Sequence, residues 1–388
     1  WFILSLKKND EIKLNIESVT SEGSALGRYN GLAVFVFGAV PGDVVEAHII
    51  KVSKNYAVGI IKKIIEKSPF RIESDCPVSD KCGGCTFRSM TYEKELQSKL
   101  DFVNGNMERI AKLPIRCEEI IGASDILRYR NKAQYPVCIQ GNGFCAGFYA
   151  YKSHRIVPAA DCLLQPAEFK AGVEAFEKWA LAANVSSFDE KSGRGLLRRI
   201  YFRKAFATGE IMACAVINGS SVPEPQMLVS FLQSALPGLK SVVLNINKNK
   251  TNVILGEKTK LLWGSEKITD MLLGKKFIIS PQSFYQVNHA QCEKLYSAAA
   301  ELAGLSGSET VLDMYCGAGT VGISLSDKCK SLCGIEIVPQ AVENAIENAR
   351  LNNLSNAEFI CADAYEGAKI LTQKGVRPDV VILDPPRK

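Results

Sequence analysis

Three closely spaced cysteines are the first residues whose type and spacing predict chemistry. In "CPVSDKCGGC" five residues separate Cys76 from Cys82, and two glycines separate Cys82 from Cys85. Thiolates this close can converge on one metal centre, and the glycines let the backbone turn tightly around it. Cys162, in "AADCLLQP", is the best candidate for a fourth ligand. Zinc and a 4Fe–4S cluster both accept four thiolates, and a gap longer than the roughly two to four residues typical of zinc sites favours iron–sulfur. The alternative is three unliganded core cysteines, against which the polar, turn-like composition argues.

A glycine-rich loop between an apolar strand and the start of a helix predicts a nucleotide site. In "VLDMYCGAGTVGISL", Gly317, Gly319 and Gly322 match the dinucleotide-binding spacing, which alone is a weak signal. Glycines let a ligand approach the backbone, and the N-terminus of the following helix favours a carboxylate or phosphate. Glu336 ends the next predicted strand, seventeen residues after Gly319, where it can accept hydrogen bonds from ribose hydroxyls. These residues leave NAD and S-adenosylmethionine both open.

The last two predicted strands separate the two cofactors. Asp363 follows the third strand, at a position suited to an adenine amino group, and Asp384-Pro385-Pro386 follows the fourth. Asp-Pro-Pro at this position faces the reacting methyl group in methyltransferases, whereas a dehydrogenase gives no reason for it. The pattern therefore favours S-adenosylmethionine; an ordinary turn explains Pro-Pro but not its register with the glycine loop. Methylation of an adenine amino group is a further alternative, but Arg387 stands where that chemistry needs an aromatic residue.

A basic and aromatic strand is a candidate RNA contact. The stretch "GRGLLRRIYFRK" at 193–204 surrounds Tyr201 and Phe202 with arginines and lysines. Basic side chains neutralise phosphates and aromatic rings stack on bases, a combination suited to single-stranded or looped RNA. The alternative is a half-buried strand with a solvated basic face, and the sequence leaves both open. The candidate RNA-binding residues are Arg130, Lys132, Arg198, Arg199 and Phe202.

Three regions of different periodicity must position these residues. Residues 5–66 alternate apolar and polar side chains in short runs such as "EIKLNIESV", which predicts a small all-β barrel of the OB type. Residues 67–275 form an α+β central domain with the cysteines, and we expect its helical segment at about 90–113 to pack on the C-terminal domain. Residues 276–388 alternate strand-like and helical runs ("TVLDMYC", "SLCGIEIV", "AEFICAD", "DVVILDPP"), which is typical of an α/β Rossmann-like domain with a parallel sheet.

Composition narrows the class of protein. A net charge of +6 over 388 residues suits an acidic partner such as RNA but does not identify one. The opening "WFILSLKKND" is too short for a transmembrane helix and lacks the basic flank of a signal peptide. Thirteen cysteines without such a signal are expected to be mostly reduced thiols. We therefore expect a cytoplasmic monomer with no membrane partner.

Taken together, these motifs resemble the RNA uracil-5-methyltransferase family, and specifically its iron–sulfur branch that acts on 23S ribosomal RNA. The resemblance runs from about residue 8 to the last residue. It rests on the four cysteines and on the stretches "LRYRNKAQYPV", "GFYAYKSHRIV", "ISPQSFYQVN", "LDMYCGAGT", "GIEIV" and "LDPPRK". It implies that the N-terminal barrel is a TRAM domain and that the C-terminal domain is a class I methyltransferase domain, incomplete at its C-terminus. It also implies RNA, with 23S ribosomal RNA foremost, as the substrate.

The resemblance implies two cofactors and their ligands. A 4Fe–4S cluster would be held by Cys76, Cys82, Cys85 and Cys162. S-adenosylmethionine would be bound by Gln286, Tyr315, Gly317, Gly319, Thr320, Glu336, Asp363 and Asp384. In the chemistry of the family, a Cys thiolate adds to C6 of uridine, C5 attacks the methyl group, and a base, usually Glu, removes the C5 proton before the Cys is eliminated. A paired uridine must first be flipped out of its helix.

The sequence departs from the family at its end. The nucleophilic Cys and the base lie, in the family, on strands after Asp-Pro-Pro-Arg, and this sequence stops at Lys388. None of the thirteen cysteines matches the nucleophile, and Cys316 is interpreted as a packing residue of the cofactor loop. The catalytic residues therefore stay unassigned, and we expect that this polypeptide, taken literally, does not methylate RNA. Two other functions stay open: a non-catalytic RNA-binding protein and a tRNA uridine C5-methyltransferase.

Overall fold

The computed structural model describes residues 6–141, 143–251 and 253–385. The chain divides into two compact units, one of Trp1–Ser124 with Phe148–Val157 and one of Asp125–Gly147 with Pro158–Lys388. This division differs from the three predicted domains, because the boundary expected between residues 275 and 276 falls inside the second unit. In the described ranges, none of the helices is both long and apolar enough to cross a membrane.

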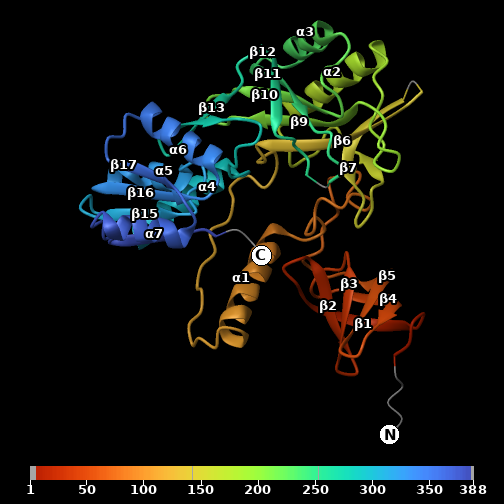
Figure 1. The fold of residues 1–388 in the computed structure, drawn as a ribbon. Coiled ribbons are helices and arrows are strands. Elements are labelled where there is room, and N and C mark those ends of the chain that lie inside the picture. Colours follow the sequence, from red (N-terminus) through yellow and green to blue (C-terminus); the bar gives the residue numbers. More distant parts are fainter. Residues whose placement is uncertain (1–5, 142, 252, 386–388) are drawn as a thin grey trace. The chain divides into compact units, whose positions relative to one another are not determined.

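The N-terminal strands close into the predicted barrel (Figure 1). Its strand order is β1-β2-β3-β5-β4, and β4 pairs again with β1. Along β1, Ile12, Leu14 and Ile16 are buried while their neighbours are exposed, so the period-two pattern places one apolar row inside the barrel. The strands are β1 (Glu11–Val19), β2 (Ser24–Tyr29), β3 (Leu32–Phe37), β4 (Val44–Val52) and β5 (Tyr56–Glu66).

A buried ion pair attaches the segment after the barrel to it. Asp43 is fully buried and accepts hydrogen bonds from the backbone of Val40 at 2.7 Å and of Ser68 at 2.9 Å. The guanidinium of Arg71 binds the same carboxylate through Nε at 3.0 Å. Helix α1 (Tyr92–Arg109) follows, where the Thr91 side chain caps its N-terminus by accepting from the Lys94 backbone. The predicted helix is confirmed, and it belongs to the unit that contains the barrel.

Most strands of a seven-stranded sheet belong to the second unit. Its order is β12-β11-β10-β9-β6-β7-β8, with β10 and β11 parallel and β9 antiparallel to both of its neighbours. Helices α2 (Glu168–Ala182) and α3 (Pro225–Ala235) pack on it. The strands are β6 (Lys132–Gln140), β7 (Gly143–Tyr149), β8 (Ile156–Pro158), β9 (Leu197–Lys204), β10 (Ile211–Ile217), β11 (Leu239–Ile246) and β12 (Lys258–Gly264).

The C-terminal strands form the predicted parallel sheet, in the order β17-β16-β15-β18. Helices α5 and α6 lie on one face and α7 on the other (Figure 1). The hairpin β13 (Ile268–Leu272) and β14 (Lys275–Ile279) precedes the sheet. The remaining elements are α4 (His289–Leu302), β15 (Thr310–Met314), α5 (Thr320–Leu325), the 3-10 turn η1 (Ser326–Lys328), β16 (Ser331–Glu336), α6 (Pro339–Leu351), β17 (Ala357–Cys361), α7 (Ala364–Gln373) and β18 (Val380–Leu383).

One hydrophobic core joins the two sheets of the second unit. It contains Met212 and Val243 from the seven-stranded sheet together with Val311 and Leu332 from the parallel sheet. A smaller cluster around Leu371 packs α7 against the other face of the parallel sheet. The parallel sheet is therefore covered on both faces, as expected for strands that are connected by crossover helices.

Candidate cofactor site

The carboxyl ends of the parallel strands gather most of the predicted cofactor residues at one edge of the sheet. Tyr315 follows β15, Glu336 is the last residue of β16, and Asp384 follows β18. Asp363 lies two residues after β17 and caps α7, where its Oδ1 accepts from the backbone N–H groups of Tyr365 and Glu366 at 2.9 Å each. Ligands of doubly wound sheets bind at this edge. Pro386 and Arg387, on which the distinction from adenine methylation depended, lie outside the described residues.

The glycine loop has the backbone conformation that brings a ligand close. Tyr315, Gly317 and Gly319 all have positive φ, at 69°, 55° and 78°. A Cβ added to Gly317 would meet no atom within 4 Å, whereas one added to Gly319 would meet Ile323 Cδ1 at 2.8 Å. Gly319 therefore serves packing, and Gly317 borders open space. Thr320 starts α5, and its Oγ1 lies 3.4 Å from the hydroxyl of Tyr296 on α4.

Glu336 is held in place by the backbone around it. Its Oε2 accepts from the N–H of Gly317 at 3.1 Å, and its Oε1 accepts from the N–H of Val338 at 2.8 Å. A carboxylate has about four acceptor positions, so each oxygen keeps capacity for a further donor. The side chain is half-buried, which leaves it accessible to the hydroxyl groups of a ligand.

A buried carboxyl beside the loop is a functional candidate that sequence reasoning missed. Asp313 is 2% exposed and accepts from the Gly322 N–H at 2.9 Å. Burial, together with the negative charges of Asp384 and Glu336, raises the pKa of Asp313 to about 7, against the effect of that hydrogen bond, which lowers it. We call Asp313, Glu336 and Asp384 the acidic edge. Its potential favours a cationic ligand over the diphosphate of a dinucleotide.

Cys316 has the packing role that was predicted for it. The residue is 5% exposed, and burial raises the pKa of its thiol above the usual value. A Cβ on Gly334 would come within 2.9 Å of its Sγ, so the thiol fills space against β16. A buried, protonated thiol is a poor nucleophile.

The segment 280–288, which contains Gln286, is anchored to the seven-stranded sheet. Asn131 Nδ2 donates to the Gln286 carbonyl at 2.7 Å, and the Asn131 N–H donates to the Val287 carbonyl at 2.9 Å. The buried guanidinium of Arg203 donates to the Ser283 carbonyl, and the Tyr201 hydroxyl donates to the Pro281 carbonyl at 3.0 Å. Asn131 and Arg203 were not predicted as positioning residues, because nothing in a strand pattern shows which distant loop it will meet.

On the basic strand β9, the structure corrects the predicted role of Phe202. Phe202 is fully buried, and its ring stacks on Phe169 of α2 with centroids 5.1 Å apart. The prediction that Phe202 stacks on RNA bases is therefore wrong, because the strand lies in the middle of a sheet that α2 covers. Arg198 donates to the carbonyls of Asn247 and Asn249 at 2.8 Å each, which favours the structural interpretation of that side chain.

The remaining predicted RNA contacts have different surroundings. Arg199 is half-buried, and its guanidinium lies 3.9 Å from the carboxylate of Glu190. Arg130 forms a β-bridge with Asn288 just before β6. Lys132 begins β6 and lies directly opposite Arg203 in the register between β6 and β9. Two of the predicted basic residues thus lie beside the segment that contains Gln286.

The four predicted cluster cysteines, Cys76, Cys82, Cys85 and Cys162, are half-buried. Cys82 Sγ accepts from the Gly84 N–H at 3.4 Å, and a Cβ on Gly83 would approach the Tyr151 backbone nitrogen within 2.8 Å. Cys76, Cys82 and Cys85 belong to the first unit and Cys162 to the second. Among the described residues, no three His, Cys, Asp or Glu side chains are grouped so as to hold a metal ion. The predicted cluster site therefore stays a prediction.

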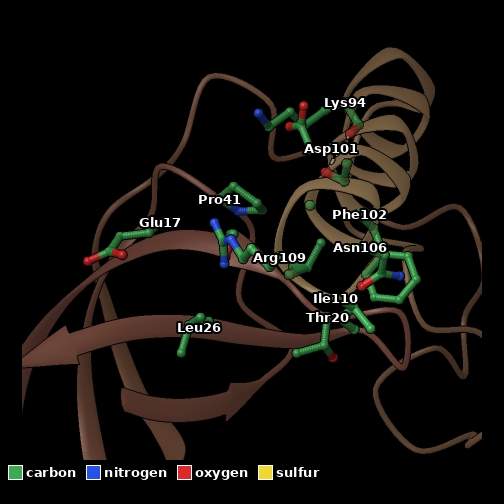
Figure 2. Close-up of a pocket in the computed structure, with 14 residues that line it drawn as sticks. Glu17, Thr20, Leu26, Pro41, Lys94, Asp101, Phe102, Asn106, Arg109 and Ile110 are labelled. Atoms are coloured by element: carbon green, nitrogen blue, oxygen red, sulfur yellow. Dashed lines mark hydrogen bonds between the residues drawn. The ribbon is translucent and has the colours of Figure 1, made fainter. Parts of the chain in front are cut away.

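A separate hollow of about 360 Å³ lies in the first unit between the barrel and α1 (Figure 2). Arg109 and Ile110 at the end of α1 share its lining with Thr20 and Leu26 of the barrel. Its charged lining residues are two acids and two bases: Glu17, Asp101, Lys94 and Arg109. Because these charges balance, the lining has no evident preference for an anion or a cation.

Two family models match the two ends of the chain, and curated relatives match nearly its whole length. A family model described as a TRAM domain matches residues 6–62, and one described as a methyltransferase domain matches residues 305–385. An uncharacterised RNA methyltransferase of Halalkalibacterium halodurans is 41% identical over 384 residues, which is 99% of this chain and 84% of that protein. An uncharacterised RNA methyltransferase of Clostridium acetobutylicum is 41% identical over 389 residues, covering 100% of this chain and 85% of the relative.

A solved structure resembles the chain along most of its length. It is the tRNA (uracil-54, C5)-methyltransferase of Pyrococcus abyssi in complex with S-adenosyl-L-homocysteine. The two share 25% identity with a TM-score of 0.74, over 96% of this chain and 83% of that protein.

Proposed function

The chain belongs to the RNA methyltransferases, and we propose that it methylates C5 of a uridine in RNA with S-adenosylmethionine as the methyl donor. The observation that carries the proposal is the likeness to the uracil C5-methyltransferase of Pyrococcus abyssi, which covers 96% of this chain. That enzyme was solved with S-adenosyl-L-homocysteine, which is the donor after it has lost its methyl group. The TRAM and methyltransferase matches support an RNA substrate and the same donor.

The negative charge of the acidic edge supports a donor whose sulfur is positively charged. S-adenosylmethionine supplies, when bound, an electrophilic methyl group on a positively charged sulfur. Asp313, Glu336 and Asp384 give this edge of the sheet negative charge that would suit a cationic donor, and the open space at Gly317 would allow the ligand to approach the loop. NAD brings two phosphate charges instead, which the same carboxylates would repel.

Three of the predicted residues would have distinct roles in holding the donor. Glu336, which the backbone orients, would accept from the ribose hydroxyls, and Asp363 at the start of α7 would accept from the adenine amino group. Gln286 would orient the methionine end of the donor from the anchored segment 280–288. The other residues of the proposed site are Tyr315, Gly317, Gly319, Thr320 and Asp384. The nucleophilic Cys and the base of the family chemistry are assigned to no residue of this sequence.

Isothermal titration with S-adenosyl-L-homocysteine and with NAD tests the cofactor assignment. We expect Glu336→Ala to weaken binding of S-adenosyl-L-homocysteine by about 10- to 100-fold, because hydrogen bonds to a charged group are lost. Glu343→Ala is the matched control, since Glu343 lies exposed on α6 and bonds only to Gln340 among the described side chains. Tight binding of NAD without binding of S-adenosyl-L-homocysteine would overturn the assignment.

The choice of RNA rests on the resemblance, which favours 23S ribosomal RNA, while the solved neighbour acts on tRNA. Methylation assays with unmodified 23S fragments and unmodified tRNA separate these substrates. Binding of RNA without methyl transfer by the protein expressed from its whole reading frame would favour the non-catalytic alternative. Methyl transfer to adenine would favour the amino-group chemistry. A monomeric state and a cytoplasmic location complete the proposal.

We further propose that Cys76, Cys82, Cys85 and Cys162 bind a 4Fe–4S cluster. Their spacing in the sequence supports it, and no step of the methyl transfer uses the cluster. Anaerobic purification followed by iron and sulfide assays tests it. Iron and acid-labile sulfide in equal amounts are expected, and stoichiometric zinc without iron would refute the assignment.

A further inference from the structure

Lys132 lies in an unusual position for a lysine. It is the first residue of β6, and its Cα partner on the antiparallel strand β9 is Arg203. Directly opposed residues of such a pair point to the same face, and like charges there destabilise the sheet. Arg203 is only 4% exposed and Lys132 is half-buried, so water screens this repulsion poorly.

The partners of the two side chains differ. Arg203 donates to the Tyr201 hydroxyl and to the Ser283 carbonyl. Lys132 Nζ has no hydrogen bond or ion pair with any residue that the structure describes. Burial, together with the positive charges of Arg203 on β9 and Arg130 before β6, lowers the pKa of Lys132 to about 8. The charged groups that act on Lys132 are both cations.

Nearby acids are engaged with other cations. Glu168 Oε1 lies 2.5 Å from Lys204 Nζ, on the residue that follows Arg203. Asp161 Oδ1 lies 2.7 Å from Arg128, two residues before Arg130. At the acidic edge, the charged groups that shift the pKa of Asp313 are Asp384 and Glu336, and none of these cations is among them. A half-buried lysine that has only cations around it would gain stability from a negative charge supplied from outside the chain.

We propose that Arg130, Lys132 and Arg203 form a site for an oxyanion, and that its occupant is a phosphodiester group of the RNA substrate. This inference rests on the proposed function. The backbone of Arg130 and Asn131 pairs with residues 287 and 288, so the bound phosphate would lie beside the segment that contains Gln286. RNA brings successive phosphates without countercharges, which suits three cations. The carboxylate of S-adenosylmethionine is accompanied by its own ammonium group and suits them less.

At this site, RNA binding is coupled to the uptake of a proton by Lys132. With a pKa of about 8, Lys132 is partly neutral in the free protein near that pH. A bound phosphate favours the charged lysine, so RNA binding takes up protons. At about pH 8 the uptake approaches half a proton per complex, and at about pH 7 it falls to roughly a tenth. Above about pH 8, RNA affinity from this site falls as the lysine loses its charge.

Calorimetric titration of in vitro transcribed, unmodified 23S rRNA fragments and tRNA, in two buffers of different ionisation enthalpy, measures this uptake. We expect wild type to take up protons at about pH 8 and Lys132→Arg to bind RNA without uptake, because arginine stays charged. Lys132→Met should weaken RNA binding about 10-fold and lower the salt slope by about 0.7 to 1. Lys330→Met is the control, since Lys330 is exposed at the opposite edge of the parallel sheet.

Thermal unfolding separates this role from a structural one. Removal of an unpaired buried charge relieves repulsion, so Lys132→Met should raise the Tm of the free protein at about pH 7 by about 2–4 °C. A lower Tm with RNA affinity equal to that of the control would overturn the inference. Proton uptake on binding S-adenosyl-L-homocysteine alone would assign the site to the cofactor carboxylate and overturn it as well.

Two further outcomes distinguish this inference from the proposed function. Normal RNA binding and methylation by Lys132→Met would refute the phosphate site and leave the proposed function intact. Absence of RNA binding by wild type, with retained binding of S-adenosyl-L-homocysteine, would refute both.

Discussion

Asp313 is a carboxyl group that the fold removes from water and places beside other carboxylates. Because its folded pKa of about 7 lies above the usual value, the stability that this group contributes is complete in acid and is lost as pH rises through about 7. A bound cation would oppose this rise in pKa. Cofactor binding and the protonation of Asp313 are therefore linked.

We predict that the preference for S-adenosylmethionine over S-adenosyl-L-homocysteine increases between about pH 6 and pH 8. The sulfonium attracts ionised Asp313 and the neutral thioether does not, so the ratio of the two affinities should change by about 3- to 10-fold. Asp313→Asn keeps an acceptor for the Gly322 N–H and removes the charge, and it should make the ratio independent of pH. Titration calorimetry of both ligands at several pH values measures this. The same pH dependence in Asp313→Asn would contradict the role of the acidic edge.

Single residues were predicted best where one local pattern determines them. The glycine loop and Glu336 follow from strand, turn and helix signals close together in the sequence. Phe202 was misassigned because alternation along "LRRIYFRK" does not reveal that α2 covers the strand. The environments of Asp313 and Lys132 depend on Asp384 and Arg203, which are distant in sequence, so no motif could show them.

At the scale of elements, the seven-stranded sheet holds segment 280–288, which contains Gln286 and leads into the parallel-sheet part of the chain. Strands β6 and β9 hold segment 280–288 through Asn131, Tyr201 and Arg203. The segment then enters α4, whose N-terminus Asn288 caps by accepting from the Gln291 N–H at 3.1 Å. The position of Gln286 therefore depends on residues about 80 to 155 positions away in the sequence.

We predict that Asn131→Ala weakens binding of S-adenosyl-L-homocysteine by about 3- to 10-fold, because the Gln286 carbonyl loses a hydrogen bond worth about 1 kcal/mol. Asn106→Ala, in α1 of the first unit, is the control for removal of an asparagine side chain. Calorimetry measures both. Equal affinities in the two variants would show that the anchoring of segment 280–288 does not affect the cofactor.

The parallel strands and the barrel strands were predictable as elements because their periodicities are regular and their neighbours follow closely in sequence. The seven-stranded sheet was recognised only as a strand-rich region. Its central pairs, β9 with β6 and β10 with β11, join strands that other elements separate, and residue pattern alone does not specify such non-local pairing.

At the scale of the whole molecule, the chain forms two compact units whereas three domains were predicted. Both sheets of the second unit contribute to one hydrophobic core. The first unit has its own core in the barrel and its own buried ion pair, Asp43 with Arg71. Burial would raise the pKa of Asp43, but hydrogen bonds from Arg71 and Ser68 outweigh it and hold the pKa below its usual value.

We predict that Arg71→Met destabilises the first unit by about 3–5 kcal/mol, because it leaves a buried carboxylate without its partner. Arg28→Met is the matched control: its pair with Glu17 is exposed and should contribute less than about 1 kcal/mol. Differential scanning calorimetry should show Arg71→Met lowering one unfolding transition, while S-adenosyl-L-homocysteine raises the other. The stability from Asp43 should be lost as pH falls below about 3.9. A single transition that shifts as a whole would contradict independent units.

The proposed reaction takes place at C5 of a uridine. The most direct measurement is the release of tritium from RNA labelled at C5 of uridine, with the protein expressed from its whole reading frame. Methylation at C5 must displace that hydrogen, so the account predicts tritium release into water that requires S-adenosylmethionine and matches methyl incorporation one for one. Methyl incorporation without tritium release would place the reaction on another atom and contradict the account.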